Sequence, residues 1–84
     1  MENLRILAKN LDQKNEIINL FVLLGYKEDS FCTYNNDDLM GIHVYKDGDI
    51  QDVPDEDYNH DEHKEITLPE LRALVSLHKN PINI

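Results

Sequence analysis

Apolar residues between positions 11 and 24 recur with the spacing of an α-helix. Four of them occupy positions i, i+3, i+4 and i+7: Ile17, Leu20, Phe21 and Leu24. Residues at this spacing share one face of a helix. Asp12 and Glu16 fall in its first turns, where carboxylates interact favourably with the helix dipole, and Gly25 suits a C-terminal cap. We therefore predict a helix from about Leu11 to Leu24.

A second helical pattern lies near the end of the sequence. Thr67 and Glu70 form a T-x-x-E capping box, and Pro69 is tolerated in a first turn. Five side chains then share one face: Leu68, Leu71, Leu74, Val75 and His78. Asn80 is suited to cap the C-terminal end, and Pro81 prevents the helix from continuing. We predict a helix between Thr67 and Asn80.

Shorter runs before and between these helices favour strands. Apolar and polar residues alternate loosely over Leu4–Ala8, and Ser30–Tyr34 is rich in β-branched and aromatic residues. The polar cluster Asn35–Asp38 is typical of a turn. Leu39–Tyr45 has the composition of the next strand.

The tripeptide KDG at positions 46–48 connects this strand to another and allows two registers. A two-residue turn pairs Tyr45 with Ile50, which places Ile50 and Val44 on opposite faces. A three-residue loop, with its glycine in the left-handed conformation, pairs Val44 with Ile50 instead. That register collects Ile42, Val44 and Ile50 on one buried face, so we prefer it.

Together these elements predict an α+β fold in the order β-α-β-β-β-α. We expect a small, mainly antiparallel sheet of three to four strands with two helices packed on one face. A chain of 84 residues supports one core, so we expect a single domain over residues 1–84. The expected core is Ile17, Leu20, Phe21, Leu24, Ile42, Val44, Ile50, Leu71, Leu74 and Val75. Pro54 ends the sheet pairing, and residues 54–65 lack apolar periodicity, which predicts a solvated acidic loop.

The negative charge of the chain is concentrated in one quarter of its length. Nine carboxylates lie between positions 47 and 65: Asp47, Asp49, Asp52, Asp55, Glu56, Asp57, Asp61, Glu62 and Glu65. With Lys64 as the only cation, this segment carries −8 of the formal net charge of −9. Such an excess of acid repels nucleic-acid phosphates and anionic membranes. A basic protein is the natural complement, so we take these nine carboxylates as candidate partner-binding residues.

Two interpretations of the acidic segment remain open. A run of charge is most often a solvated surface that keeps a small protein soluble. Solubility alone, however, does not require charge to be focused in one hairpin and loop. If Asp47 and Asp49 both lie in extended chain, they are roughly 7 Å apart, about twice the ~3.4 Å rise per phosphate of one DNA strand. The segment then mimics nucleic-acid charge toward a basic groove.

Candidate catalytic and metal-binding residues are few. His60 and His63 have the i, i+3 spacing of two ligands on one helical turn. No distant cysteine or histidine pair completes a metal site, so an exposed acidic loop is the favoured interpretation. Cys32 and His43, on neighbouring predicted strands, are conceivable as nucleophile and base, but a buried structural cysteine is commoner. We expect no enzymatic activity, no cofactor and no metal site.

Several features favour a cytoplasmic protein. Cys32 is the only cysteine, so an internal disulfide is excluded and a reducing compartment fits. The start MENLRIL lacks the basic leader and long apolar run of a signal peptide. The longest apolar-rich run, Ile17–Leu24, is far shorter than the ~20 residues that span a bilayer.

Two short motifs flank the middle of the chain: Leu24-Gly25-Tyr26 at the end of the first predicted helix, and Ile66-Thr67-Leu68, followed by Glu70 and Leu71, at the start of the last. Together with the order of elements, these motifs resemble small accessory proteins of T-even-like tailed bacteriophages. In those proteins a helix commonly ends in L-G-Y, and the chain closes on an ITL-x-E-L-like helix start. The resemblance covers about Leu4 to Val75. It implies an early phage protein without catalytic residues that acts in the bacterial host cytoplasm by binding a host factor, often a defence nuclease, a toxin or a CRISPR complex.

The favoured function is therefore a non-enzymatic phage inhibitor. It blocks a basic, nucleic-acid-handling host protein through its acidic hairpin and loop. The alternative is an antitoxin-like or structural interaction module whose acidic segment is only solubilising. In that case an apolar patch binds the partner, and Val22 and Leu23, which widen the apolar face of the first helix, are candidates. Both alternatives are compatible with a homodimer.

Overall fold

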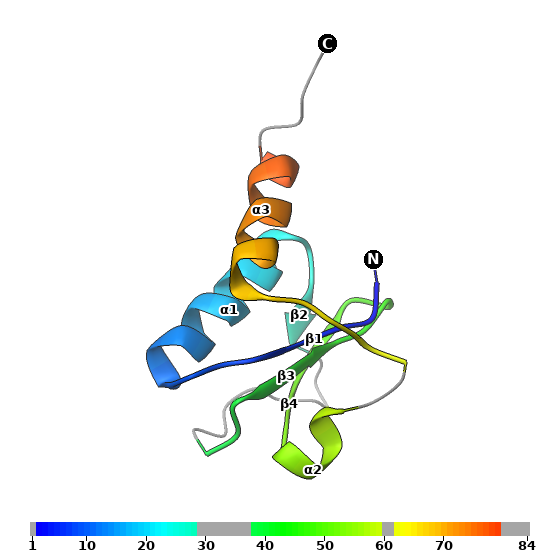
Figure 1. Ribbon diagram of the computed structural model, residues 1–84. Coiled ribbons are helices and arrows are strands. Elements are labelled where there is room, and N and C mark those ends of the chain that lie inside the picture. Colours follow the sequence, from blue (N-terminus) through cyan, green and yellow to red (C-terminus); the bar gives the residue numbers. More distant parts are fainter. Residues whose placement is uncertain (1, 29–37, 60–61, 80–84) are drawn as a thin grey trace.

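The computed structural model describes residues 2–28, 38–59 and 62–79 (Figure 1). The fold is α+β, as predicted. Its elements follow in this order: β1 (Leu4–Leu7), α1 (Leu11–Leu23), β2 (Lys27–Glu28), β3 (Gly41–Val44), β4 (Asp49–Val53), α2 (Asp55–Tyr58), β5 (Lys64–Glu65) and α3 (Leu68–Lys79). The strands β2 and β5 and the short helix α2 were not predicted, and the observed order is longer than β-α-β-β-β-α.

The five strands form one mixed sheet in the order β2-β4-β3-β1-β5. Its centre is antiparallel, because β3 pairs with both β1 and β4 in that direction. Each edge adds a parallel strand of two residues, β2 beside β4 and β5 beside β1. The mainly antiparallel centre was predicted, whereas both parallel edges were missed because two-residue strands carry no periodicity.

Helix α1 begins and ends where local sequence signals place it. At its start, the side-chain oxygen of Asn10 accepts a hydrogen bond of 2.8 Å from the backbone N–H of Gln13, which satisfies one of the free donors of the first turn. Leu24 caps the C-terminal end, and Gly25 adopts a left-handed φ of 105°. This conformation strains residues that carry a Cβ, so the glycine fits.

Helix α3 begins with the predicted capping box. The backbone N–H of Thr67 donates to Glu70 Oε1 at 3.0 Å, and the N–H of Glu70 donates to Thr67 Oγ1 at 3.3 Å. The helix ends at Lys79. The predicted caps Asn80 and Pro81 lie outside the described residues.

The hairpin between β3 and β4 has the preferred register. Val44 pairs with Ile50, and Gly48 has a left-handed φ of 104°. The N–H of Gly48 donates to the Tyr45 carbonyl at 2.8 Å, which closes the three-residue loop. The predicted strand Ser30–Tyr34 and most of the turn after it fall outside the described residues.

The core lies between the sheet and the helices α1 and α3, which cover the same face (Figure 1). Its buried residues are Leu4, Ile6, Ala8, Ile17, Ile18, Phe21, Tyr26, Ile42, Val44, Ile50, Ile66 and Leu71. Leu20 and Leu24, predicted in the core, are partly buried and pack against it. The prediction for Leu74 is wrong, since 40% of its surface is exposed. Helix α3 extends beyond the sheet (Figure 1), so only its inward side chains, such as Leu71 and Val75, are covered.

The prediction of a solvated loop over residues 54–65 is wrong in part. Pro54 does end strand pairing, but the next residues form α2, and Tyr58 is buried. Tyr58 packs over Gly41, where an added Cβ would lie 3.0 Å from Tyr58 Cδ1 and 3.0 Å from the Val53 carbonyl oxygen. A glycine in β3 therefore leaves the space into which α2 docks. Among the described helices, none combines the length and the apolar character needed to cross a membrane.

Candidate functional site

The face of the sheet opposite α1 and α3, here called the open face, carries a different set of side chains. Arg5, His43 and Gln51 are Cα partners across β1, β3 and β4. Successive side chains of a strand point to opposite faces. These three residues therefore lie on the face opposite to Ile42 and Val44.

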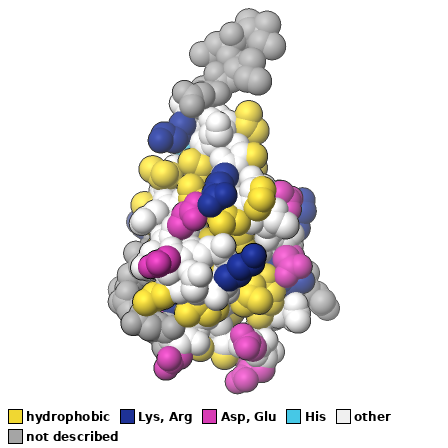
Figure 2. Space-filling model, turned by 60° about the vertical axis from the view of Figure 1, so that its left-hand side comes forward, with side chains coloured by type: hydrophobic (Ala, Val, Ile, Leu, Met, Phe, Trp, Pro, Cys, Tyr) yellow, Lys and Arg dark blue, Asp and Glu magenta, His cyan; other side chains and the backbone are white. Residues whose placement is uncertain are grey.

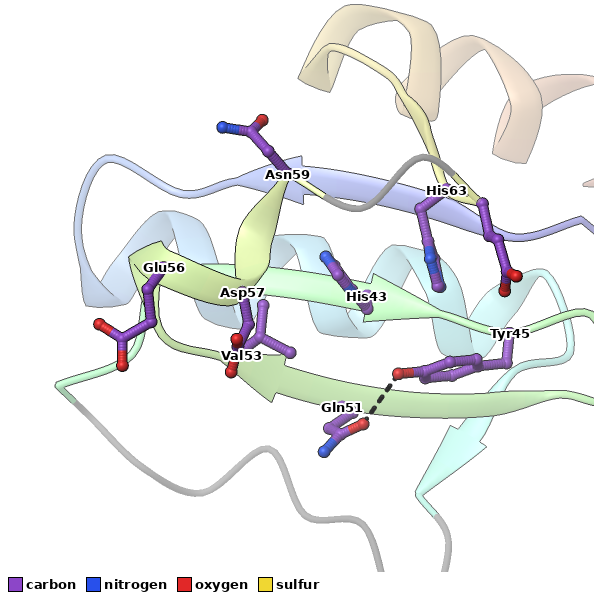
Figure 3. A pocket seen from close by; sticks show the side chains of 9 residues that line it. His43, Tyr45, Gln51, Val53, Glu56, Asp57, Asn59 and His63 are labelled. Atoms are coloured by element: carbon purple, nitrogen blue, oxygen red, sulfur yellow. Dashed lines mark hydrogen bonds between the residues drawn. The ribbon is translucent and has the colours of Figure 1, made fainter.

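A pair of stacked histidines lies on the open face. The rings of His43 and His63 have centroids 4.3 Å apart and an interplanar angle of 23°, and both residues are buried. Tyr45 meets His63 edge-on, with centroids 4.9 Å apart. The Tyr45 hydroxyl donates to Gln51 Oε1 at 2.9 Å (Figure 3). These contacts fix the orientation of the aromatic rings.

Helix α2 is attached to the open face through Tyr58. Nε2 of His43 lies 2.8 Å from the Tyr58 carbonyl oxygen, and since a carbonyl only accepts, the imidazole nitrogen donates. The Tyr58 hydroxyl donates to Glu65 Oε2 at 2.8 Å. The Arg5 guanidinium carbon lies 5.5 Å from the Tyr58 ring centroid, within cation–π range. Burial, and then the Glu65 carboxylate, raise the pKa of the Tyr58 hydroxyl.

A hollow of about 420 Å³ opens between α2 and the histidine pair. It is lined by His43, Tyr45, Gln51, Val53, Glu56, Asp57, Asn59, Glu62 and His63. Figure 3 shows Glu56 and Asp57 at the α2 end of this hollow, and Tyr45 and His63 toward the other end. Three of the lining residues are acidic, and none of the described ones is Lys or Arg.

The structure separates the nine candidate carboxylates. Asp55, Glu56 and Asp57 are exposed on α2, and Asp47, Glu62 and Glu65 are also exposed. Acidic side chains gather at the lower end of the molecule, where Figure 1 places α2 (Figure 2). Asp49 is half-buried in β4, and Asp61 lies outside the described residues.

Asp52, one of the nine candidate partner-binding carboxylates, does not lie at the surface. Its Oδ2 lies 2.9 Å from Nζ of Lys14, and both side chains are buried on the helix-covered face. A carboxylate in this position supports the fold and is not available to a partner. Asp47 and Asp49 do not both lie in extended chain, because Asp47 lies in the hairpin turn and only Asp49 belongs to a strand, so the condition for the ~7 Å spacing is not met.

The residues considered for metal binding and catalysis lie in different surroundings. His63 was expected on an exposed loop, but it is buried against His43. His60, the first of the paired histidines, lies outside the described residues, and so does Cys32, for which a structural role was favoured. Within residues 2–28, 38–59 and 62–79, no group of three potential ligands is arranged to hold a metal ion. His78 lies exposed on α3.

Sequence reasoning missed the hollow and its aromatic side. Two signals were present: His43 alternates with Ile42 and Val44 in a predicted strand, and Tyr58 is an isolated aromatic residue among carboxylates. The first places a histidine opposite the core, and the second indicates an anchor within the acidic segment. Neither signal predicts that His63 stacks on His43.

Apolar side chains are also exposed on the helices. Val22 and Leu23 of α1 and Leu74 and Leu77 of α3 each leave 40% or more of their surface exposed. Figure 2 shows apolar side chains on this side of the molecule, interrupted by charged ones. Arg72 of α3 forms a bidentate pair with Glu16 of α1, at 2.9 and 3.1 Å, which links the two helices across the surface.

No protein-family model matches the chain, and no curated protein or solved structure matches it.

Proposed function

We propose that the protein is a non-enzymatic inhibitor of tailed-phage type that binds a basic, nucleic-acid-handling host protein through its acidic surface. The observation that carries the proposal is α2, which exposes Asp55, Glu56 and Asp57 within one helical turn and is attached to the sheet by the buried Tyr58. An acidic segment that only solubilised the protein would not require such an attachment. The motif resemblance to phage accessory proteins supports a host defence nuclease, a toxin or a CRISPR complex as the partner class.

The charges that remain at the surface support an electrostatic mode of binding. Seven described carboxylates between positions 47 and 65 are not buried: Asp47, Asp49, Asp55, Glu56, Asp57, Glu62 and Glu65. A focused negative patch speeds association with a basic protein and repels nucleic acid itself. Binding that depends on such charges weakens as salt shortens the Debye length, from ~10 Å at 0.1 M to ~3 Å at 1 M.

The test is capture of host proteins from a bacterial lysate at low and high salt, with three forms of the protein. The first is the wild type, and the second carries Asp55→Asn, Glu56→Gln and Asp57→Asn. The third is a matched control that loses three charges on the helical side, through Glu2→Gln, Asp12→Asn and Glu16→Gln. We expect a basic protein to be captured by the wild type and the control and to be lost with the α2 variant. Equal capture by all three forms contradicts the proposal.

The exposed apolar residues of the helices favour a second candidate function, an antitoxin-like or structural interaction module. In that case Leu74→Gln with Leu77→Gln abolishes capture, whereas the α2 variant does not. Salt then has little effect on the complex, because apolar contacts are not screened.

A further inference from the structure

The hollow on the open face combines acidic walls with an aromatic side. Glu56, Asp57 and Glu62 supply carboxylates, and Tyr45 lies beside the stacked histidines. We infer that the hollow accepts the guanidinium group of an arginine side chain presented by a protein partner. The inference rests on the proposed function and names the chemistry that holds the basic partner.

The charges around the hollow select a cation. Glu56 and Asp57 form no ion pair with any residue in the described part of the chain, so their charge is available to a ligand. They project from α2, whereas Glu62 comes from the segment that follows, so a group in the hollow meets carboxylates from two elements. Carboxylates on the walls of a concave site focus negative potential. A phosphate group is repelled by the same walls.

The aromatic side favours arginine over lysine. The Tyr45 ring is held edge-on to His63, and its hydroxyl is bonded to Gln51. A planar guanidinium stacks on an aromatic ring and donates to carboxylates as a fork, whereas an ammonium is compact and strongly hydrated. The open face already contains one such contact, because the Arg5 guanidinium lies 5.5 Å from the centroid of the Tyr58 ring.

The size of the hollow also allows an arginine side chain to enter. Its volume of about 420 Å³ lies near the lower end of the range for ligand pockets, ~300–1,000 Å³. It lies beside α2, which carries the exposed carboxylates of the proposed contact surface. A partner that docks on α2 therefore brings its own side chains to the mouth of the hollow.

The test is an NMR titration of the full chain with the acetylated, amidated peptide Gly-Gly-Arg-Gly-Gly. We expect a Kd on the order of 1 mM, as suits a single side chain. The ring resonances of His43, Tyr45 and His63 should shift, and those of the distant His78 should not. The corresponding lysine peptide should bind about threefold more weakly. The citrulline peptide, which keeps the shape and lacks the charge, should leave the rings unshifted.

Two sets of variants locate the binding site. Glu56→Gln with Asp57→Asn and Glu62→Gln should raise the Kd of the arginine peptide about tenfold. The matched helical-side control defined above should change the Kd by less than about twofold. Tyr45→Leu, which removes the ring, should bind about two- to fivefold more weakly.

Unchanged binding in the hollow variant, or equal shifts with the citrulline peptide, overturns the inference. Equal binding of lysine and arginine peptides overturns the guanidinium preference. Failure of the proposed function is distinguishable, because it is measured by capture from lysate and not by the peptide. Capture that depends on α2, combined with a peptide that leaves the rings unshifted, removes the arginine site and keeps the acidic surface.

Discussion

The two faces of the sheet are built from different chemistry. On the helix-covered face, aliphatic side chains of β1, β3 and β4 pack against α1 and α3, and the ion pair Lys14–Asp52 is buried among them. On the open face, aromatic and polar side chains form directional contacts under a helix of four residues. The first face gains most of its stability from apolar burial. The open face gains less stability from apolar burial, but its contacts fix the positions of side chains that a partner can reach.

The largest expected effect concerns the ion pair Lys14–Asp52, which is buried on the helix-covered face. Lys14→Met leaves Asp52 as a buried carboxylate without its cation, which should destabilise the protein by about 3–5 kcal/mol. Lys14→Met combined with Asp52→Leu should restore stability to near the wild-type value, because the replacement is apolar on both sides. Chemical denaturation measures both. If the double variant is as unstable as Lys14→Met, the ion pair contributes more to stability than the mutual neutralisation of its two charges.

The apolar part of the same face gives the next largest effect. Leu71 is fully buried, so Leu71→Ala should lower the free energy of unfolding by about 2–5 kcal/mol. Leu74 lies one turn further along α3 and is 40% exposed. Leu74→Ala should therefore change stability by about 0.5 kcal/mol or less. Similar midpoints for the two variants in urea would mean that α3 packs through a different side.

A substitution at Gly41 shows how far the open face depends on close packing. An added Cβ would meet Tyr58 and Val53 at about 3 Å, so Gly41→Ala should displace α2 and cost about 1–3 kcal/mol. The ring resonances of His43 should shift, since its Nε2 donates to the Tyr58 carbonyl. Retention of the wild-type resonances and stability would show that α2 docks elsewhere.

Alkaline pH should produce the smallest effect and should act on the open face. The pKa of Tyr58 is raised in the folded protein, first by burial and then by Glu65. A raised pKa stabilises the fold fully below the unfolded value, near ~10, and the contribution is lost as pH rises above it. Stability should fall above that pH in the wild type and less steeply in Tyr58→Phe. At neutral pH, loss of the hydroxyl's hydrogen bond should cost on the order of 1 kcal/mol. If stability falls equally steeply with pH in the wild type and in Tyr58→Phe, the loss does not come from ionisation of Tyr58.

Features that depend on residues close together in the chain could be predicted from the sequence. The apolar stripe and cap of α1, the Thr67–Glu70 box and the loop at Gly48 involve residues a few positions apart. The register of β3 with β4 could also be predicted, because only one of the two possible registers puts Ile42, Val44 and Ile50 on the same face.

Features that depend on residues distant in the chain could not be predicted. Lys14 and Asp52 are 38 positions apart, and each is typical of a solvated surface in its own segment. In the same way, His63 belongs to an acidic stretch without periodicity, and its burial depends on contact with β3. The acidic character of the segment that carries α2 could be read from the sequence, whereas α2 itself and the hollow beside it could not be predicted.

The attachment of α2 by Tyr58 has a consequence for the thermodynamics of association. A carboxylate on a mobile loop loses backbone freedom when it meets a partner, at roughly 1–2 kcal/mol for each residue that becomes fixed. In this protein α2 is restrained through Tyr58 before it meets a partner. The Tyr58 carbonyl accepts a hydrogen bond from His43, its hydroxyl donates one to Glu65, and its ring lies against the Arg5 guanidinium. Much of that entropic penalty is thus incurred during folding. The acidic helix is preorganised, so substitutions of Tyr58 that leave every surface charge intact should still weaken affinity by releasing the helix.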